Sequence, residues 1–336
     1  MNTNQPLVTV VIPMYNVANY ILDAINSVLQ QSYSHFEVLC IDDGSPDHSV
    51  ALVESCTDPR VHLIRQKNRG LAGARNTGLN HANGEYIALL DADDLWHTDK
   101  LKHHVAQMQN DLDIDISYCP SLFMDDYGNK LEIGQFPKLT KITAKDILCR
   151  NPVGNGSAAV LRASFLNKIR HSKTNNPEKR IEFFDERLRQ SEDIEFWLRC
   201  ALTYQAKFEG VPDALTFYRI NEDGLSANLD KQLASWYEAM DFNTKQHSAF
   251  FERWFSLAEA YQFRYLARRA IKSGMSHQAL FFLKKALSTN VRVLTEEPKR
   301  TLSTLFCAAL LKTTPKTFEW LSKRFIAKPQ HKEVVA

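Results

Sequence analysis

Residues 84–94 read GEYIALLDADD, and this stretch decides the fold class. Its centre, residues 86–90, is an unbroken apolar run that begins after Gly84 and ends at Asp91. A short run without polar interruption is typical of a β-strand that is buried on both faces. We therefore expect a sheet covered by helices on both sides, with acidic side chains at the end of this strand.

The same kind of pattern continues on both sides of this strand. Apolar runs predict further strands at residues 7–12, 36–41, 61–64 and 114–118, the last with the alternation of a half-exposed strand. Apolar residues spaced three and four apart predict helices at residues 17–29, 47–55 and 72–81, and another that carries Leu101, Val105 and Met108. Strands alternating with helices predict an α/β fold, a Rossmann-like and mostly parallel sheet with helices on both faces.

The pattern changes in the second half of the chain. Residues 157–161 and 214–218 predict two more strands, and residues 192–202 predict a helix. After residue 227 the sequence predicts only helices, two of which are joined at Gly274. We expect an α/β domain over residues 1–227, followed by an all-α C-terminal region over residues 228–336.

The charge of the chain is unevenly distributed. The net charge is only +2, but residues 264–336 hold 15 Lys and Arg against 4 Asp and Glu. A basic tail on an acidic body indicates either a polyanionic partner, such as anionic lipid or nucleic acid, or a helical region with a solvated basic face. Of the two partners we rank nucleic acid last, because only the tail favours it.

The cysteines and the apolar segments bear on the cellular compartment. The six cysteines are scattered, without the spacing of a zinc site or a disulfide framework, so we expect reduced and mostly buried thiols. The N-terminus lacks the basic region of a signal peptide, and no stretch reaches the roughly 18–20 apolar residues of a membrane span. We expect a cytoplasmic protein, with peripheral docking to the inner face of the membrane as an option.

Polar side chains follow three of the predicted strands where each strand ends. They are Tyr15 and Asn16, shortly after Pro13 ends the first strand, Asp42 and Asp43 after the second, and Asp91, Asp93 and Asp94, with Ala92 among them, after the fourth. In an open parallel sheet, ligands bind outside the carboxyl ends of the strands. Five crowded acids repel one another unless a cation offsets their charge, so the pattern suggests a bound metal ion.

Asp91 and Asp93, separated by Ala92, have the spacing of a carboxylate pair for Mg²⁺ or Mn²⁺. These ions prefer oxygen ligands and usually bind through one or two carboxylates plus substrate phosphates. The alternative is that Asp94 and its neighbours cap a helix that begins at Leu95.

Three other residues have two interpretations each. Asp42 and Asp43 could form a turn before Gly44, or Asp43 could accept a hydrogen bond from a base while Tyr15 stacks on that base. Arg75 could pair with phosphate or base oxygens, or form a surface salt bridge.

A second acidic pair, Glu192 and Asp193, opens the helix predicted over residues 192–202. Acids at this position stabilise the N-terminus of a helix through its dipole. Alternatively, a carboxylate here could act as a general base that takes a proton from a hydroxyl.

These segments together resemble the family 2 glycosyltransferases, which have the GT-A fold. The resemblance covers residues 6–227 and is carried by VTVVIPMYN (8–16), IDDGSPD (41–47), NRGLAGARNTGL (68–79), GEYIALLDADD (84–94) and SEDIEFWLR (191–199), with YRINEDGLSAN (218–228) closing the domain. Each motif is weak alone, but five in this order are specific.

The resemblance implies a role for each matching residue. Pro13, Tyr15 and Asp43 would hold the nucleotide base, with Asp42 close by and Asn16 and Ala92 also at the nucleotide-sugar. Arg75 would contact the nucleotide, Asp91 the ribose, and Asp93 the Mn²⁺ or Mg²⁺ that bridges the diphosphate. Asp193 would be the catalytic base, with Glu192 as the second candidate.

The resemblance also implies the type of reaction. It would be inverting transfer of a hexosyl or N-acetylhexosaminyl group from a nucleotide-sugar, most often a UDP-sugar, to a glycan or lipid-linked glycan acceptor in polysaccharide or lipopolysaccharide synthesis. In the tail, Phe318, Leu321 and Phe325 beside Lys323 and Arg324 are consistent with a helix lying on an anionic membrane.

Two other functions remain as alternatives. A sugar nucleotidyltransferase would need a glycine-rich, basic loop after the first strand to hold a triphosphate, and residues 14–17 contain neither glycine nor lysine. A non-catalytic nucleotide-sugar-binding or scaffold protein would not need the Asp91, Asp93 and Asp193 set that this sequence retains.

Overall fold

The computed structural model describes residues 5–174, 179–220 and 228–325, with side chains up to residue 321 in the last helix. The chain divides into two compact units, one of Met1–Ile147 with Asn151–Asn221 and one of Leu148–Arg150 with Glu222–Ala336. The domain boundary predicted at residue 227 lies outside the described residues.

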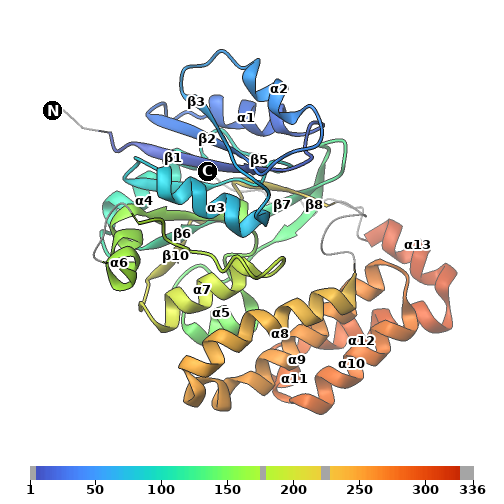
Figure 1. Ribbon diagram of the computed structural model, residues 1–336. Coiled ribbons are helices and arrows are strands. Elements are labelled where there is room, and N and C mark those ends of the chain that lie inside the picture. Colours follow the sequence, from blue (N-terminus) through green and yellow to red (C-terminus); the bar gives the residue numbers. More distant parts are fainter. Residues whose placement is uncertain (1–4, 175–178, 221–227, 326–336) are drawn as a thin grey trace. The chain divides into compact units, whose positions relative to one another are not determined.

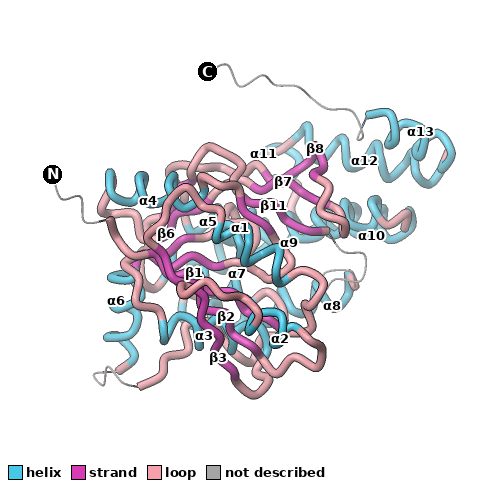
Figure 2. Tube along the Cα trace, turned by 90° about the horizontal axis from the view of Figure 1, so that it is seen from above, coloured by secondary structure: helices cyan, strands magenta, loops and turns pink. Residues whose placement is uncertain are grey.

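The first unit is built on a seven-stranded sheet with the order β10-β6-β9-β4-β1-β2-β3. Its strands are β1 (Val8–Met14), β2 (Phe36–Asp42), β3 (Val61–Arg65), β4 (Tyr86–Leu89), β6 (Ile116–Tyr118), β9 (Val160–Arg162) and β10 (Phe208–Gly210). Strands β1 to β4 are parallel, and only β9 runs antiparallel to its neighbours. Figure 2 shows β1, β2 and β3 side by side. The predicted mostly parallel sheet is confirmed.

The two faces of β1 explain its unbroken apolar sequence. Val8, Val10 and Ile12 pack in one core with helix α1 (Ile21–Leu29). Val11 faces helix α3 (Gly70–His81), where a Cβ atom added to Gly78 would lie 2.2 Å from the Val11 side chain. Alternate side chains of a strand point to opposite faces, so helices cover both sides of the sheet (Figure 1).

The remaining helices of this unit are mostly short. They are α2 (Ser49–Glu54), α4 (Lys100–Asn110), α5 (Ala144–Arg150), α6 (Ala163–Lys173) and α7 (Glu192–Leu202), with a 3₁₀ turn, η1, at Gly156–Ala158. The last three residues of α5 are assigned to the second unit. The bounds predicted for α7 are confirmed. The half-exposed character predicted for residues 114–118 is wrong, because β6 lies inside the sheet between β9 and β10 and is fully buried.

A second sheet of four strands was not foreseen from the sequence, apart from one strand. It has the order β5-β11-β7-β8, formed by β5 (Leu95–Trp96), β11 (Thr216–Arg219), β7 (Ser121–Met124) and β8 (Lys130–Gln135). Only β11 corresponds to a predicted strand, at residues 214–218. The others are short or partly exposed, so their apolar patterns are weak.

The second unit is helical throughout its described part, as predicted. Its helices are α8 (Leu229–Gln246), α9 (Ser248–Lys272), α10 (Ser276–Thr289), α11 (Arg292–Glu296), α12 (Pro298–Thr313) and α13 (Pro315–Phe325). The turn between α9 and α10 contains Gly274 with φ +72°, a left-handed conformation that glycine adopts without strain. Among the described residues, no helix is long and apolar enough to cross a membrane. All six cysteines are free thiols.

Candidate active site

The ends of β1, β2 and β4 meet at one edge of the main sheet, as the sequence predicted. Met14 lies opposite Asp42 in the register of β1 and β2, and the backbone N–H of Asp43 donates to the Met14 carbonyl (3.0 Å). On the other side of β1, the N–H of Leu90 donates to the Val11 carbonyl (3.0 Å). The segments that carry the predicted site residues therefore start from neighbouring strands.

Asp43 is buried and holds the loop that leads into α3. Its Oδ1 accepts hydrogen bonds from Gln66 Nε2 (2.7 Å) and from the backbone N–H of Arg69 (2.8 Å), and its Oδ2 accepts one from the N–H of Gly70 (2.8 Å). Asp42 is also buried and accepts a hydrogen bond from the N–H of Ser45 (2.9 Å). The turn-forming interpretation thus fits Asp42, whereas Asp43 holds residues 66–70.

The turn after β1 presents one aromatic ring to solvent. Pro13 is buried within β1 opposite Ile41, whereas Tyr15 is 50% exposed. Asn16 has φ 57°, an uncommon left-handed conformation for a residue with a side chain, and its N–H donates to Ser45 Oγ (3.4 Å). Only Tyr15 and Asn16 of the predicted first-strand residues are open to a ligand.

Arg75 occupies the centre of the site. Its Nη2 lies 2.6 Å from Asp91 Oδ1 and its Nη1 lies 2.6 Å from Glu192 Oε1, while the side chain is 2% exposed. Burial acts to lower the pKa of Arg75, but the charges of Asp91 and Glu192 raise it overall, so the guanidinium is charged. The interpretation of Arg75 as a surface salt bridge is wrong, because the ion pairs are buried.

Asp94 is an internal support and not a helix cap. It is fully buried, accepts hydrogen bonds from Ser157 Oγ (2.5 Å) and from the backbone N–H of Arg219 (2.9 Å), and precedes a strand, β5. The same Ser157 hydroxyl accepts a hydrogen bond from the N–H of Asp91 (2.9 Å). Asp94 and Ser157 therefore fix the backbone on which Asp91 and Asp93 lie.

Asp93 is the acid best suited to a metal ion. Burial and the charge of Asp91 raise the pKa of its carboxyl to about 6, a crowding of like charges that a bound cation would relieve. The described residues contain no group of three or more His, Cys, Asp or Glu arranged to hold a metal, so the five acids do not together form a metal site, and Asp93 alone remains the predicted ligand. Asp42, Asp43 and Asp94 are instead engaged by hydrogen bonds within the protein. Carboxylate oxygen from Asp93 together with substrate phosphates still suits Mg²⁺ or Mn²⁺.

Helix α7 begins with a strained residue and two acids. Ser191 has φ 61°, and such left-handed residues cluster at functional sites. Glu192 is buried and held by Arg75, whereas Asp193 is partly exposed and bonded only to the N–H of Ile194 (2.8 Å) among the described residues. Burial, and then the charge of Glu192, raise the pKa of Asp193 to about 7. Asp193 is therefore better suited than Glu192 to accept a proton.

Two asparagines of α3 position the segment before α7, and the sequence analysis missed both. Buried Asn76 accepts hydrogen bonds from the N–H groups of Phe183 (2.9 Å) and Phe184 (2.8 Å) and donates to the Phe184 carbonyl (2.8 Å). Asn80 pairs in the same way with the N–H and carbonyl of Ile181 (3.0 and 2.8 Å). Asparagine is a poor helix former, so two of them four residues apart on one helix were the available signal.

Two further residues shape the site: Arg219, in the segment 218–228 that closes the domain, and Gly156, which lies in none of the motifs. Arg219 Nε donates to the Asp93 carbonyl (2.7 Å), and its Nη1 donates to the carbonyls of Asp125 (3.0 Å) and Asp126 (2.7 Å). Gly156 lies so close to the central ion pair that an added Cβ would be 2.2 Å from Arg75 Nη2 and 3.0 Å from Asp91 Oδ2.

The substitution Gly156→Ala is expected to destabilise the protein by about 1–3 kcal/mol, because the new methyl group displaces Arg75 or Asp91 in a packed interior. Urea denaturation of both proteins measures this loss. Gly128→Ala serves as the control, since nothing lies within 4 Å of its Cβ position and only its positive φ resists the change. An equal loss in the two variants would contradict the role given to Gly156.

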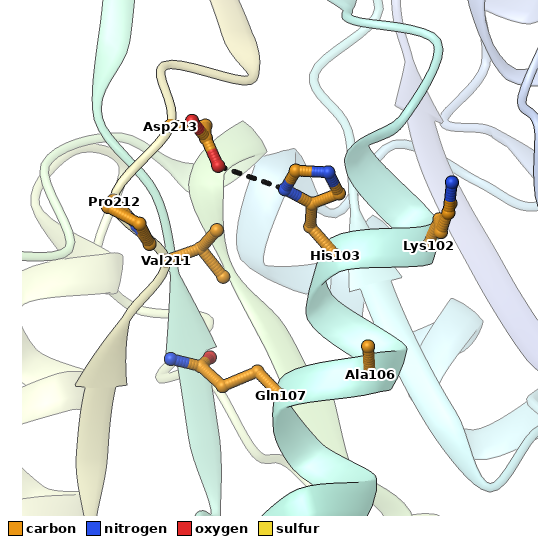
Figure 3. A pocket seen from close by; sticks show the side chains of 7 residues that line it. All are labelled: Lys102, His103, Ala106, Gln107, Val211, Pro212 and Asp213. Carbon is orange, nitrogen blue, oxygen red and sulfur yellow. Dashed lines mark hydrogen bonds and ion pairs between the residues drawn. The ribbon is translucent and has the colours of Figure 1, made fainter. Parts of the chain in front are cut away.

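The first unit also has a recess that contains none of these residues. It has a volume of about 430 Å³ and is lined by Lys102, His103, Ala106, Gln107, Val211, Pro212 and Asp213 (Figure 3). His103 Nδ1 lies 3.0 Å from Asp213 Oδ2 at its rim, and Gln107 Nε2 donates to the Gly210 carbonyl (3.0 Å). The recess is thus separate from the acids at the strand ends.

Comparisons with known proteins agree with this geometry. The family model described as "Glycosyl transferase family 2" matches residues 9–170. The chain is 29% identical over 246 residues to an uncharacterized glycosyltransferase, MJ1057, of Methanocaldococcus jannaschii, covering 70% of this chain and 78% of the relative. It is also 29% identical over 235 residues to the Escherichia coli enzyme WfgD, named UDP-Glc:alpha-D-GlcNAc-diphosphoundecaprenol beta-1,3-glucosyltransferase, covering 70% of this chain and 85% of WfgD.

A solved structure supports the same fold. The mannosyltransferase PcManGT from Pyrobaculum calidifontis, solved with GDP-Man and Mn²⁺, superposes with a TM-score of 0.57 at 20% identity, covering 94% of this chain and 89% of PcManGT. At this identity the likeness bears on the fold alone, which is the GT-A fold that the sequence motifs implied. The matching family model and relatives of this length support a glycosyltransferase of family 2.

Proposed function

We propose that this protein is an inverting glycosyltransferase that moves a hexosyl or N-acetylhexosaminyl group from a UDP-sugar to a hydroxyl of a glycan or lipid-linked glycan. One observation carries the proposal. Arg75 joins Asp91, at the end of β4, to Glu192, the neighbour of Asp193. One buried arginine thus joins Asp91, on the donor side, to the residue that precedes the proposed base.

The relatives support the substrate classes. WfgD is named for a UDP-Glc donor and a diphosphoundecaprenol-linked acceptor, and PcManGT was solved with a nucleotide-sugar and Mn²⁺. By analogy we place this protein in the synthesis of a cell-surface polysaccharide or lipopolysaccharide, at the cytoplasmic face of the membrane. Tyr15, with its exposed ring, is the candidate for stacking on the base.

The chemistry follows from the positions of the acids. The acceptor hydroxyl transfers its proton to the Asp193 carboxylate while its oxygen attacks the anomeric carbon, and the bond from that carbon to the nucleoside diphosphate breaks on the opposite face. A Mn²⁺ or Mg²⁺ ion held by Asp93, when bound, neutralises charge on the departing diphosphate. One base is sufficient for inversion, so no covalent nucleophile is needed. Arg75 holds the Glu192 carboxylate in place beside the base.

The test is nucleotide release from UDP-Glc, UDP-GlcNAc and GDP-Man, with Mn²⁺ or EDTA, for the wild type and Asp93→Asn. We expect release from one donor in Mn²⁺ and a loss of at least about 100-fold in EDTA or in the variant, because charge stabilisation of the leaving group is lost. Asp213→Asn, which changes an exposed acid beside His103, is the matched control and should keep full activity.

Two different results would contradict the metal site and the transferase function. Release that is equal in Mn²⁺ and EDTA would contradict the metal at Asp93. If calorimetry with metal present showed no binding of UDP, dTDP or GDP, the transferase function would be abandoned for a scaffold.

A further inference from the structure

Helix α12 has two apolar faces, and its core contacts use only one of them. Thr301, Thr304, Ala308 and Leu311 are buried, and α12 packs against α9 and α10. On another side of the helix, Leu302 is 54% exposed, Leu305 41% and Phe306 63%, and Ala309 is also exposed. These four residues, here called the α12 stripe, are spaced as one helix face, at i, i+3, i+4 and i+7.

The α12 stripe is distinct from the apolar residues that the sequence suggested for membrane contact. Of those residues, Phe318 on α13 packs against the core cluster of the second unit. Leu321 is partly buried, and the side chain of Phe325 lies outside the described residues. Three large exposed apolar side chains on one helix face mark an interaction surface more often than a solvated one.

Positive charge flanks the stripe. From residue 298 to residue 316 the chain holds Lys299, Arg300, Lys312 and Lys316 and no acidic residue. At about 100° per residue, Lys299 falls just beyond one side of the stripe and Lys312 just beyond the other. Both lysines are exposed, and neither forms an ion pair with a described residue.

We propose that the α12 stripe lies on an anionic lipid surface, with Lys299 and Lys312 on the headgroups at its two margins. An apolar face bordered by basic residues is the arrangement of helices that lie in the plane of a membrane interface. A second copy of the chain fits less well, because residues 298–316 hold no acidic residue that could pair with these lysines across a two-fold interface. This proposal does not depend on the transfer reaction.

The test is sedimentation of the full chain with vesicles of phosphatidylcholine, alone or with about one third phosphatidylglycerol, at low and high salt. We expect binding to the anionic vesicles only, weakened by salt. The variant Leu302→Ser/Leu305→Ser/Phe306→Ser should bind at least about thirty-fold more weakly, because it removes most of the apolar area. Lys299→Gln/Lys312→Gln should lose about five-fold per lysine.

Control variants distinguish binding by the α12 stripe from nonspecific binding by other exposed apolar side chains. Leu112→Ser/Val291→Ser removes two other exposed apolar side chains, 75% and 60% exposed, and should bind as the wild type does. Far-UV circular dichroism and thermal unfolding of all variants should match the wild type, which reports that the helical unit is folded, and nucleotide release without vesicles should be unchanged. A wild type that binds neither vesicle, or a triple-serine variant that binds normally, would overturn the proposal. So would a wild-type dimer in light scattering that becomes monomeric in the triple variant, since a second copy would then cover the stripe.

Discussion

Replacement of Asp193 by asparagine is expected to slow sugar transfer by about 10²–10⁴-fold, the range that a positioned general base contributes. Asparagine has nearly the same shape but cannot take the proton of the acceptor hydroxyl. The neighbouring Glu192 cannot substitute for it, because Arg75 holds that carboxylate. The measurement is the rate of product formation with saturating donor and acceptor. The affinity for the nucleotide should stay within a few-fold of the wild type, since we propose that Asp193 acts on the acceptor.

The pH dependence gives a second readout of the same residue. The pKa of Asp193 is raised to about 7, so the carboxylate is protonated below that pH and cannot act as a base. Transfer by the wild type should rise with pH up to about 7 and then level off. The residual activity of Asp193→Asn should lack this rise. A variant that kept more than a tenth of the activity, or kept the same pH profile, would show that another group is the base.

Replacement of Arg75 by methionine is expected to lower the free energy of unfolding by about 3–5 kcal/mol and to abolish transfer. Removing one partner of a buried ion pair leaves uncompensated buried charge, and here two carboxylates, Asp91 and Glu192, lose their partner at once. Chemical denaturation measures the first effect, and the donor-release assay measures the second.

A matched control for Arg75→Met is Arg60→Met, which removes an ion pair to Asp58 at the surface. The side chains of that pair are 34% and 24% exposed, so the loss should stay below about 1 kcal/mol. The double variant Arg75→Met/Glu192→Gln should recover part of the lost stability, because one orphaned charge is then gone. Equal losses for Arg75→Met and Arg60→Met would contradict the central role of the buried pair.

The main sheet was predictable from sequence because its strands are covered on both faces. A continuous apolar run such as residues 86–90 fits few structures other than a buried strand. Helix α7 was predicted with its correct bounds because acidic residues mark its first turn and apolar residues recur along one face. The second sheet was not, apart from β11. Strand β5 has two residues and β8 is partly exposed, so the apolar pattern of these segments is too weak to predict a strand.

The acids of the site were predictable, but their partners were not. Asp91, Asp93 and Asp193 follow or precede elements with strong signals. The ion pair from Arg75 to Glu192 joins residues 117 positions apart, and Asn76 holds residues more than 100 positions away. Such contacts depend on how the chain packs, and neither spacing nor propensity in one sequence encodes them. For the same reason the sequence did not show that Asp42, Asp43, Asp91 and Asp94 are engaged by hydrogen bonds within the protein.

These long separations also constrain how the protein forms on the ribosome. When residue 100 has emerged, β1 to β4 and Asp91 are present, yet Arg75 still lacks Glu192, and Asp94 lacks the N–H of Arg219, which lies 125 residues further along the chain. Closing loops of this length costs conformational entropy, and the contacts that offset this cost form only after the loops have closed. A nascent chain shorter than about 220 residues therefore carries buried charges without their partners, and the first unit can become stable only after β11 has been synthesised.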